Sequence, residues 1–409
     1  MAKQTSTPKV SILVPIFNVE KYLRQCLDSV VNQSLKDIEI ICINDGSTDS
    51  SPEIIDEYAK NDSRFVVINK ANSGYGDSMN KGLEKARGEY IGIVESDDWV
   101  DIDMFENLYN LAIKNDVDVV KSNFYFYSGL GNTNKKFPLV NRADSEKVIN
   151  PLETNSVFFP QAAIWTGLYK KAFLTKNSIA FLPTAGASYQ DTGFNFKVWA
   201  SAKKAFLTND AYLHYRIDND NSSVKSKGKI FAVVDELTEM YKFAKATKHF
   251  KQLKPILFQR KYEIYMWNYG RLTSDAAREF IAHLNKELKS DKDNGLYDTT
   301  LLTRKEKTLF GLIATSPSLF HLLKFTTGSK KLFKRVAKKA ARTFFPAHRS
   351  LHKHQMALAE MADKIDNLNY HIDLINRVNK KWQPNNHQSV LSFQSGIRRN
   401  ISTDASLAL

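Results

Sequence analysis

Short apolar runs alternate with amphipathic stretches over the first 120 residues of the chain. The runs are rich in Ile and Val, as buried strands are, and they lie at 10–16, 38–43, 65–68, 90–94 and 117–120. Between them, apolar residues recur at helical spacing, as from Val19 to Val30. Strands that each lead into a helix predict right-handed βαβ units and a mostly parallel sheet.

Polar residues predict where two of these helices begin. We expect Asn18 to cap the helix that follows the first strand, because its short side chain can bond a free amide of the first turn. Ser51 is the expected cap of the second helix, and Pro52 suits that helix's first turn.

The pattern changes several times after residue 120. Residues 128–156 predict a loop or lid, because they are polar and irregular, and 205–215 predicts one more strand. The expected fold class is α/β: a mostly parallel sheet with flanking helices, followed by a C-terminal α-helical extension. The predicted segments are a disordered N-terminus (1–9), a sheet domain (10–225), a helical region (230–289), a basic amphipathic region (304–349), a helical or coiled-coil segment (350–382) and a disordered tail (383–409).

A basic amphipathic helix is predicted from Ser329 to Phe345. One face carries seven cations and no acid, namely Lys330, Lys331, Lys334, Arg335, Lys338, Lys339 and Arg342. An anionic membrane surface and nucleic acid both suit such a face. We favour the membrane, and no nucleic-acid partner, because the opposite face ends in Phe344 and Phe345.

Apolar residues then recur at spacings of three and four between Leu358 and Ile375. This spacing indicates either a short coiled coil, and hence a homo-oligomer, or a helix that packs on the chain's own helices.

Composition narrows the setting of the protein. A chain of 409 residues suggests two or three domains. Cys26 and Cys42 make no disulfide framework, which indicates a reducing compartment. The first nine residues are polar, and no apolar run reaches the ~18 residues of a membrane span. We therefore expect a cytoplasmic protein that associates peripherally with the inner face of the plasma membrane.

An acidic cluster follows the fourth predicted strand. Glu95, Asp97 and Asp98 lie directly after a buried run, where carboxylates repel one another and lose hydration unless a cation or donor compensates. Ligands of open parallel sheets bind beyond the carboxyl ends of the strands. The cluster therefore predicts a site for a divalent metal and phosphate, to which the loops around Phe17 and Asp45 should converge.

Four motifs resemble, in order and spacing, the family 2 glycosyltransferases. They are Val14-Pro15-Ile16-Phe17-Asn18, Asn44-Asp45-Gly46-Ser47-Thr48-Asp49, Asn72-Ser73-Gly74 and Glu95-Ser96-Asp97-Asp98, within a resemblance that covers 10–224. The resemblance implies the GT-A fold, with a Rossmann-like nucleotide-sugar half (10–121) and an acceptor half (122–225). It also implies an inverting, metal-dependent transfer from a nucleotide-activated sugar.

The resemblance suggests a role for each motif. Pro15 and Phe17 would line the pocket for base and ribose, and Asp45 would accept a bond from uracil. Asp97 would ligate Mg²⁺ or Mn²⁺ at the diphosphate, and Asp191 would be the catalytic base. The other implied donor-binding residues are Asn18, Ser47, Asn72, Gly74, Glu95, Ser96, Asp98 and Arg216.

One residue departs from the family pattern. Glu95 stands where the family usually has the first aspartate of its metal motif. The longer side chain can still contact ribose or a metal-bound water.

Several of these residues have structural alternatives. Asp191 is also suited to cap a helix over 192–199, and Asp45 to a turn before Gly46. His214 either completes the metal site or is an ordinary hydrogen-bonded strand residue, and Arg216 offers a simpler contact to diphosphate. Tyr189 is one of three aromatic residues, with Trp165 and Trp199, that suit either sugar stacking or an aromatic core.

The function predicted from the sequence is transfer of a hexosyl or N-acetylhexosaminyl group from a UDP-sugar to a hydroxyl of a glycan or lipid-linked acceptor, in bacterial surface-polysaccharide synthesis. A sugar nucleotidyltransferase fits poorly, because the loop after the first strand is neither glycine-rich nor basic. A non-catalytic partner subunit of a polysaccharide-assembly complex is the remaining alternative, and the substitution at Glu95 is its best support.

Overall fold

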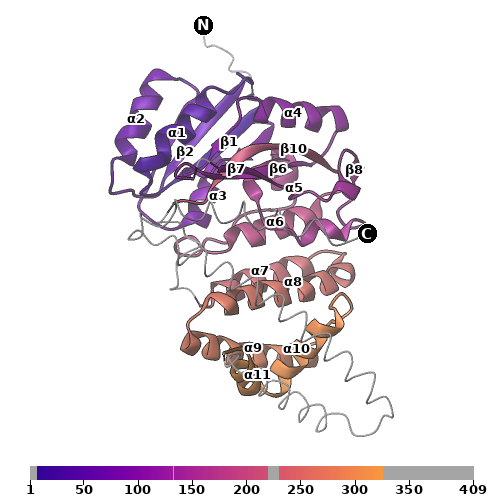
Figure 1. Cartoon of the computed structure of the whole chain (residues 1–409). Coiled ribbons are helices and arrows are strands. Elements are labelled where there is room, and N and C mark those ends of the chain that lie inside the picture. Colours follow the sequence, from indigo (N-terminus) through magenta and orange to yellow (C-terminus); the bar gives the residue numbers. More distant parts are fainter. Residues whose placement is uncertain (1–6, 132, 220–229, 326–409) are drawn as a thin grey trace, which may run out of the picture. The chain divides into compact units, whose positions relative to one another are not determined.

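The computed structural model describes residues 7–131, 133–219 and 230–325, and Figure 1 shows the arrangement of their helices and strands. Within these residues one sheet runs in the order β3-β2-β1-β4-β9-β6-β10-β5, with β7 paired to β6 and β8 to β10. The strands are β1 (Val10–Ile16), β2 (Ile38–Asn44), β3 (Phe65–Asn69), β4 (Tyr90–Ile93), β5 (Trp99–Val100), β6 (Val119–Ser128), β7 (Thr133–Phe137), β8 (Val148–Ile149), β9 (Gly167–Lys170) and β10 (Ala205–Arg216). The helices that accompany the sheet are α1 (Glu20–Val31), α2 (Ser51–Asn61), α3 (Tyr75–Lys85), α4 (Met104–Asn115), α5 (Lys171–Lys176) and α6 (Gln190–Ser201).

The parallel half of the sheet matches the sequence prediction. Strands β3, β2, β1 and β4 are neighbours and pair in parallel, as a series of βαβ units requires. Every residue of β1, β2 and β4 is buried, which explains why these strands appear as continuous apolar runs. The carboxyl ends of β2, β1 and β4 therefore meet at one edge of the sheet.

The other half of the sheet contains strands that the sequence pattern did not predict. β9 lies between β4 and β6 and runs antiparallel to both, and β7 is antiparallel to β6. The prediction of a loop or lid over 128–156 was wrong for β7 and β8. β7 reads Thr-Asn-Lys-Lys-Phe and is mostly exposed, so it carries no apolar signal and depends on backbone pairing with β6.

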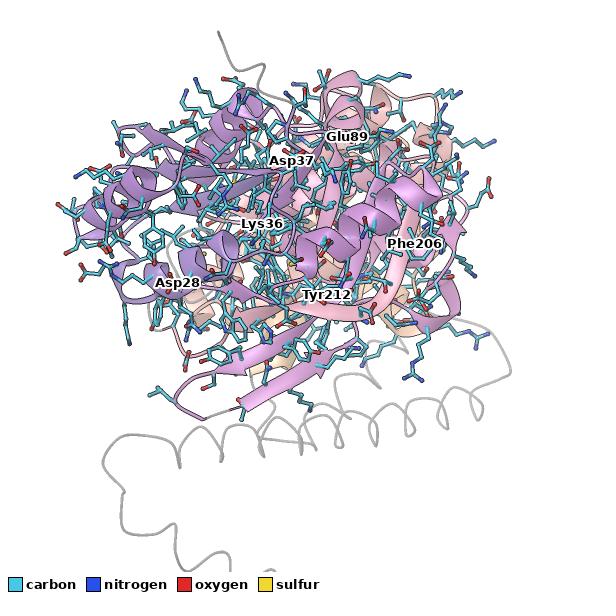
Figure 2. The ribbon with its side chains drawn as sticks, turned by 90° about the horizontal axis from the view of Figure 1, so that it is seen from above. Asp28, Lys36, Asp37, Glu89, Phe206 and Tyr212 are labelled. Atoms are coloured by element: carbon cyan, nitrogen blue, oxygen red, sulfur yellow. The ribbon has the colours of Figure 1, made fainter. Side chains whose placement is uncertain are left out.

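Side chains in this domain follow the expected division between surface and core. Asp28, Lys36 and Asp37 are exposed, whereas Phe206 and Tyr212 of β10 are buried (Figure 2).

The prediction that Asn18 and Ser51 cap their own helices was wrong, because each side chain bonds a backbone amide of another loop. Asn18 adopts a left-handed backbone with φ of 49°, and its Oδ1 accepts a bond from the Thr48 amide at 2.7 Å. Ser51 is the first residue of α2, and its Oγ accepts a bond from the Val19 amide at 3.2 Å. Both side chains therefore join the β1–α1 loop to the β2–α2 loop instead of closing their own helices.

Five further helices follow the sheet domain in the described residues. They are α7 (Ala232–Lys245), α8 (Phe250–Arg271), α9 (Ser274–Asp293), α10 (Arg304–Thr315) and α11 (Pro317–Phe325). None of the helices in the described part of the chain is long and apolar enough to cross a membrane. The predicted basic helix at 329–345 and the apolar repeat at 358–375 lie outside the described residues, and the segment boundaries stay predictions.

A buried lysine links α8 to α9. The Nζ of Lys261 lies 2.7 Å from a Glu287 oxygen and 2.6 Å from an Asp291 oxygen, and its side chain is 1% exposed. This arrangement compensates a charge that would otherwise be costly to bury.

Helix α6 packs closely against α7. Glu236 of α7 is 2% exposed and lies so near Gly193 that a Cβ at that position would meet its Oε2 at 2.1 Å. Neither carboxyl oxygen of Glu236 has a hydrogen-bond partner in the described residues. Burial raises the pKa of Glu236 to about 8, although the positive charge of Lys197 lowers it.

Replacement of Lys261 should destabilise the helical region strongly. We expect Lys261→Met to lose about 3–5 kcal/mol of unfolding free energy, because it leaves Asp291 buried without its partner. Chemical denaturation followed by circular dichroism measures the loss. Lys254→Met is the control, because Lys254 pairs with Asp298 at 3.7 Å in a more exposed place and should cost at most about 1 kcal/mol. Equal losses in the two variants would contradict the inferred role of Lys261.

Glu236 should make stability depend on pH. Its pKa is raised to about 8 in the folded protein, against an ordinary value of 4.5, so the folded state holds the proton more tightly. Stability should therefore fall as pH rises between these two values. Glu236→Gln keeps the shape without ionising, so it should be more stable than the wild type at pH 8.5, with a smaller difference at pH 5.5. Thermal midpoints at both pH values test this, with the exposed Glu84→Gln as control. A difference between Glu236→Gln and wild type that stays constant with pH would contradict it.

Candidate functional site

The loops after β1 and β2 are joined by hydrogen bonds at the carboxyl edge of the sheet. The Asn18 amide donates to Ser47 Oγ at 3.1 Å, and the Asp45 amide donates to the Ile16 carbonyl at 2.9 Å. Phe17 is 50% exposed at this edge, whereas Pro15 is buried within β1. Phe17 is thus available to a ligand, and Pro15 shapes the strand beneath it.

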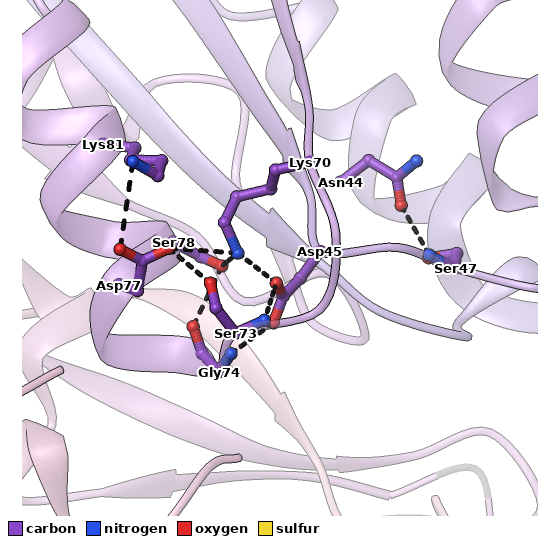
Figure 3. A network of polar contacts seen from close by, with 9 residues as sticks. All are labelled: Asn44, Asp45, Ser47, Lys70, Ser73, Gly74, Asp77, Ser78 and Lys81. Carbon is purple, nitrogen blue, oxygen red and sulfur yellow. Dashed lines mark hydrogen bonds and ion pairs between the residues drawn. The ribbon is translucent and has the colours of Figure 1, made fainter. Parts of the chain in front are cut away.

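Asp45 anchors the segment that leads into α3 (Figure 3). Its carboxylate is 6% exposed and accepts bonds from the amides of Ser73 at 2.9 Å and Gly74 at 3.0 Å. It also forms an ion pair with Lys70, which lies 3.2 Å from Asp77. Oδ2 accepts only the Gly74 bond in the described residues, so it keeps acceptor capacity for a ligand N–H.

Two glycines bring the start of α3 against the segment that precedes Asp191. Gly74 has φ of 99°, and a Cβ there would lie 2.6 Å from the backbone of Thr184 and of Gly186. A Cβ on Gly76 would lie 2.1 Å from the Leu182 carbonyl. Two glycines around one tyrosine are only a weak sign of such a contact in the sequence. Asn72, which precedes them, is exposed.

Glu95 and Asp97 lie at the end of β4 in a mostly buried acidic group. The Tyr75 hydroxyl donates to Glu95 Oε1 at 2.6 Å. The pKa of Glu95 is raised to about 8, mainly by burial and in part by the negative charges of Asp97 and Asp191, while the Tyr75 bond lowers it. Asp97 Oδ2 accepts a bond from the Asn219 amide group at 2.8 Å.

Asp98 is the most buried member of the group, at 1% exposed. Its Oδ1 accepts the Arg216 amide at 2.8 Å, while its Oδ2 has no hydrogen-bond partner in the described residues. The pKa of Asp98 is raised well above its ordinary value, mainly by burial and next by the negative charge of Asp97. Ser96, between the acids, is also buried.

Arg216 holds this acidic loop in place. Its Nε donates to the Asp97 carbonyl at 2.8 Å, and its guanidinium lies 4.6 Å and 4.9 Å from the ring centres of Tyr22 and Tyr127. The side chain is buried and also bonds Gln25. The guanidinium is thus bonded within the protein, and its contact with diphosphate stays a prediction.

His214 has the environment of a structural residue. Its Nδ1 bonds Asn134 at 2.8 Å and its Nε2 bonds Asp101 at 2.9 Å. The imidazole also stacks on Trp99, with ring centres 3.5 Å apart. The expectation that His214 ligates a metal does not fit this arrangement, because both ring nitrogens are already bonded and coordination would have to break one bond.

Asp191 lies in the first turn of α6 and belongs to the same site. Its Oδ1 accepts the Thr192 amide at 2.7 Å, and burial raises the pKa of its carboxyl. Its negative charge adds to the causes that raise the pKa of Glu95. The sequence alternative of a helix N-cap was wrong, since Tyr189 occupies that position.

Tyr215 lies between His214 and Arg216 on β10, in a segment that the family resemblance implies closes over the diphosphate. Its ring stacks on Trp165, with ring centres 5.3 Å apart. Burial raises the pKa of its phenol, and the negative charges of Asp98, Asp97, Glu95 and Asp191 raise it as well.

The residues present are compatible with a divalent cation. Within the described residues, no group of three or more His, Cys, Asp or Glu side chains is arranged to hold one. However, Mg²⁺ is commonly bound through one or two carboxylates, with substrate phosphates completing its shell. Asp98 Oδ2, in the same loop as Asp97, has no hydrogen-bond partner in the described residues and therefore keeps acceptor capacity.

Comparison with known proteins places the chain in a family. The model of "Glycosyl transferase family 2" matches residues 11–172. The cholesterol galactosyltransferase of Borreliella burgdorferi is 30% identical over 306 residues, which are 69% of this chain and 83% of that protein. The uncharacterized glycosyltransferase EpsJ of Bacillus subtilis is 34% identical over 221 residues, 53% of this chain and 62% of its own length.

A third relative is much longer than the shared region. The poly(ribitol-phosphate) beta-glucosyltransferase of Bacillus spizizenii is 33% identical over 220 residues, 52% of this chain and 33% of that protein. The chain thus spans less than two thirds of EpsJ and about a third of this enzyme.

Solved structures show the same fold. Residues 1–349 of S. aureus TarS, in complex with UDP-GlcNAc, superpose with a TM-score of 0.63 at 17% identity. The match covers 79% of this chain and 93% of that one, and it confirms the GT-A fold. By family model and by its relatives, the chain belongs to glycosyl transferase family 2.

Proposed function

We propose that the protein is a metal-dependent, inverting glycosyltransferase that moves a sugar from a UDP-sugar to a hydroxyl of a glycan or lipid-linked acceptor. The observation that carries the proposal is the meeting of two groups of carboxylates. Glu95 and Asp97 follow β4, and Asp191 lies in the first turn of α6. Tyr75 connects the two, because its hydroxyl donates to Glu95 at 2.6 Å while its amide donates at 3.1 Å to the Gly186 carbonyl, in the segment that leads to Asp191. Family membership supports the reaction class.

The donor is proposed to bind at the edge formed by the ends of β1, β2 and β4. Exposed Phe17 supplies an apolar surface for the base, and Asp45 Oδ2 has acceptor capacity for a base N–H. Hydrogen bonds join the two loops that carry these residues, so the loops are held in place before the donor binds. The TarS structures that share the fold contain UDP-GlcNAc or UDP, which favours uridine as the base.

Asp97 is the residue proposed to hold Mg²⁺ or Mn²⁺. A bound cation would neutralise charge on the leaving diphosphate. The chain's own contribution is to hold the Asp97 backbone through Arg216 and its carboxylate through Asn219. Asp98 adds a buried acid with one unpartnered oxygen beside this group.

Asp191 is proposed to take the proton of the acceptor hydroxyl. The Thr192 amide fixes Oδ1, and burial raises the pKa of the carboxyl, which improves it as a base. Inversion requires that the acceptor attacks on the face opposite the leaving diphosphate. The base must therefore come from a different element than Asp97, as Asp191 does.

The acceptor is proposed to be part of a cell-surface polymer or glycoconjugate. One relative is named for a poly(ribitol-phosphate) acceptor and another for cholesterol, so relatives of this domain differ in acceptor. The basic sequence at 329–345 supports a further proposal, that the protein associates with an anionic membrane near a lipid-linked acceptor.

Asp97→Asn should abolish metal-dependent binding of UDP, because it removes one ligand charge at constant size. Isothermal titration with UDP, in Mn²⁺ and in excess chelator, measures the metal response. Asp37→Asn, at an exposed position, is the matched control. If Asp97→Asn keeps the full metal response, Asp97 is not the ligand.

Asp191→Asn should leave UDP binding nearly unchanged and slow sugar transfer by about 10²–10⁴, the usual scale for loss of a general base. Transfer is measured by UDP release in the presence of acceptor glycans across a panel of UDP-sugars. Asp275→Asn, in the exposed first turn of α9, is the control. Transfer by Asp191→Asn at the control rate would move the base to another residue.

A further inference from the structure

An aromatic corner lies where α8 meets the start of α6. The Tyr189 hydroxyl donates to Asn268 Oδ1 at 3.0 Å, and the Tyr189 ring lies edge-to-face with Trp267, with centres 5.7 Å apart. Tyr189 holds a left-handed backbone with φ of 65°, which is uncommon for an aromatic residue. The contacts with α8 compensate this conformation.

Arg271 completes the corner. Its guanidinium carbon lies 5.3 Å from the Tyr189 ring centre and 5.2 Å from the Trp267 ring centre. Its Nε donates to Asn268 Oδ1 at 3.1 Å. Asn268 is fully buried and also donates to the Ile230 carbonyl at 2.9 Å, so it holds the Tyr189 and Arg271 side chains that contact Trp267.

Trp267 is 51% exposed although it is the largest apolar side chain type. Tyr189 and Arg271 hold one side of the indole, so its orientation is set before any ligand binds. A rigid, half-exposed indole beside a cation offers an apolar surface and polar donors together, which suits a sugar ring with its apolar C–H face and hydroxyl edge.

The corner lies close to the proposed base. Tyr189 precedes Asp191 by two residues, and the charges of Arg271 and Asp191 both act on the Tyr189 phenol. Donor-binding elements lie at the ends of β1, β2 and β4, whereas Trp267 and Arg271 come from α8, outside residues 11–172 of the family model. The corner is therefore placed for the acceptor.

We infer that Trp267, Tyr189 and Arg271 form an acceptor subsite that holds a pyranose ring of the acceptor, with Trp267 as its stacking surface. The inference rests on the proposed function and adds to it an acceptor class, a glycan presented by its sugar ring. It also assigns a role to helix α8, since that helix supplies the specificity of the acceptor side.

Saturation-transfer NMR on the full chain tests the subsite without needing turnover. The probes are methyl β-D-glucopyranoside, methyl β-D-galactopyranoside and methyl N-acetyl-β-D-glucosaminide, each added in the presence of UDP and Mn²⁺. The wild type should transfer saturation to the ring C–H protons of at least one probe. Trp267→Ala should weaken that probe at least tenfold, and Trp267→Phe should weaken it less because an aromatic face remains.

Two measurements keep the result specific. Ile113→Ala removes an exposed apolar side chain from α4 and should bind the probes as the wild type does. UDP binding, measured in the same samples, reports on the proposed function separately. If the wild type does not bind UDP, the proposed function is contradicted, regardless of whether the glycosides bind.

Two results would overturn the subsite. One is unchanged glycoside binding by Trp267→Ala, and the other is that the wild type binds none of the three probes while it binds UDP. Circular dichroism of each variant confirms the fold. If Trp267→Ala does not fold, the comparison of Trp267→Phe with the wild type tests stacking instead. Equal affinity in these two proteins, with equal saturation at the same ring protons, would contradict stacking on Trp267.

Discussion

The site depends on the cost of placing carboxylates together at a buried edge. Glu95, Asp97 and Asp98 follow a strand whose residues are all buried, so their charges are poorly hydrated and repel one another. The protein compensates with donors from distant parts of the chain: Tyr75 for Glu95, Asn219 for Asp97 and the Arg216 amide for Asp98. Much of the fold around the site serves to deliver these donors.

The compensation of these carboxylates by hydrogen-bond donors is incomplete. Asp98 keeps an unpartnered buried oxygen, and the pKa of Glu95 is raised to about 8. Arg216 supplies part of this compensation, because its backbone amide bonds Asp98 and its Nε bonds the Asp97 carbonyl, while the ring centres of Tyr22 and Tyr127 lie 4.6 Å and 4.9 Å from its guanidinium carbon.

Close backbone contacts position the segment that carries Asp191. Gly74 and Gly76 allow the start of α3 to touch residues 182–186, and the Tyr75 amide donates to the Gly186 carbonyl at 3.1 Å. The Tyr75 side chain meanwhile bonds Glu95. One turn of helix thus connects the acidic loop to the segment that carries Asp191, and helices α7 and α8 support that segment from the other side through Glu236 and Asn268.

The sequence by itself determined the parallel half of the sheet and the acidic edge. Strands buried on both faces are continuous apolar runs, and loops at the ends of adjacent parallel strands must converge, so Phe17, Asp45 and Asp97 were predictable. Tertiary structure alone decided the polar strand β7, the antiparallel β9, the partners of Asn18, Arg216 and His214, and the corner around Trp267. These features depend on contacts between residues far apart in the chain, and neither a local pattern of apolar residues nor a short motif records which distant group a side chain meets.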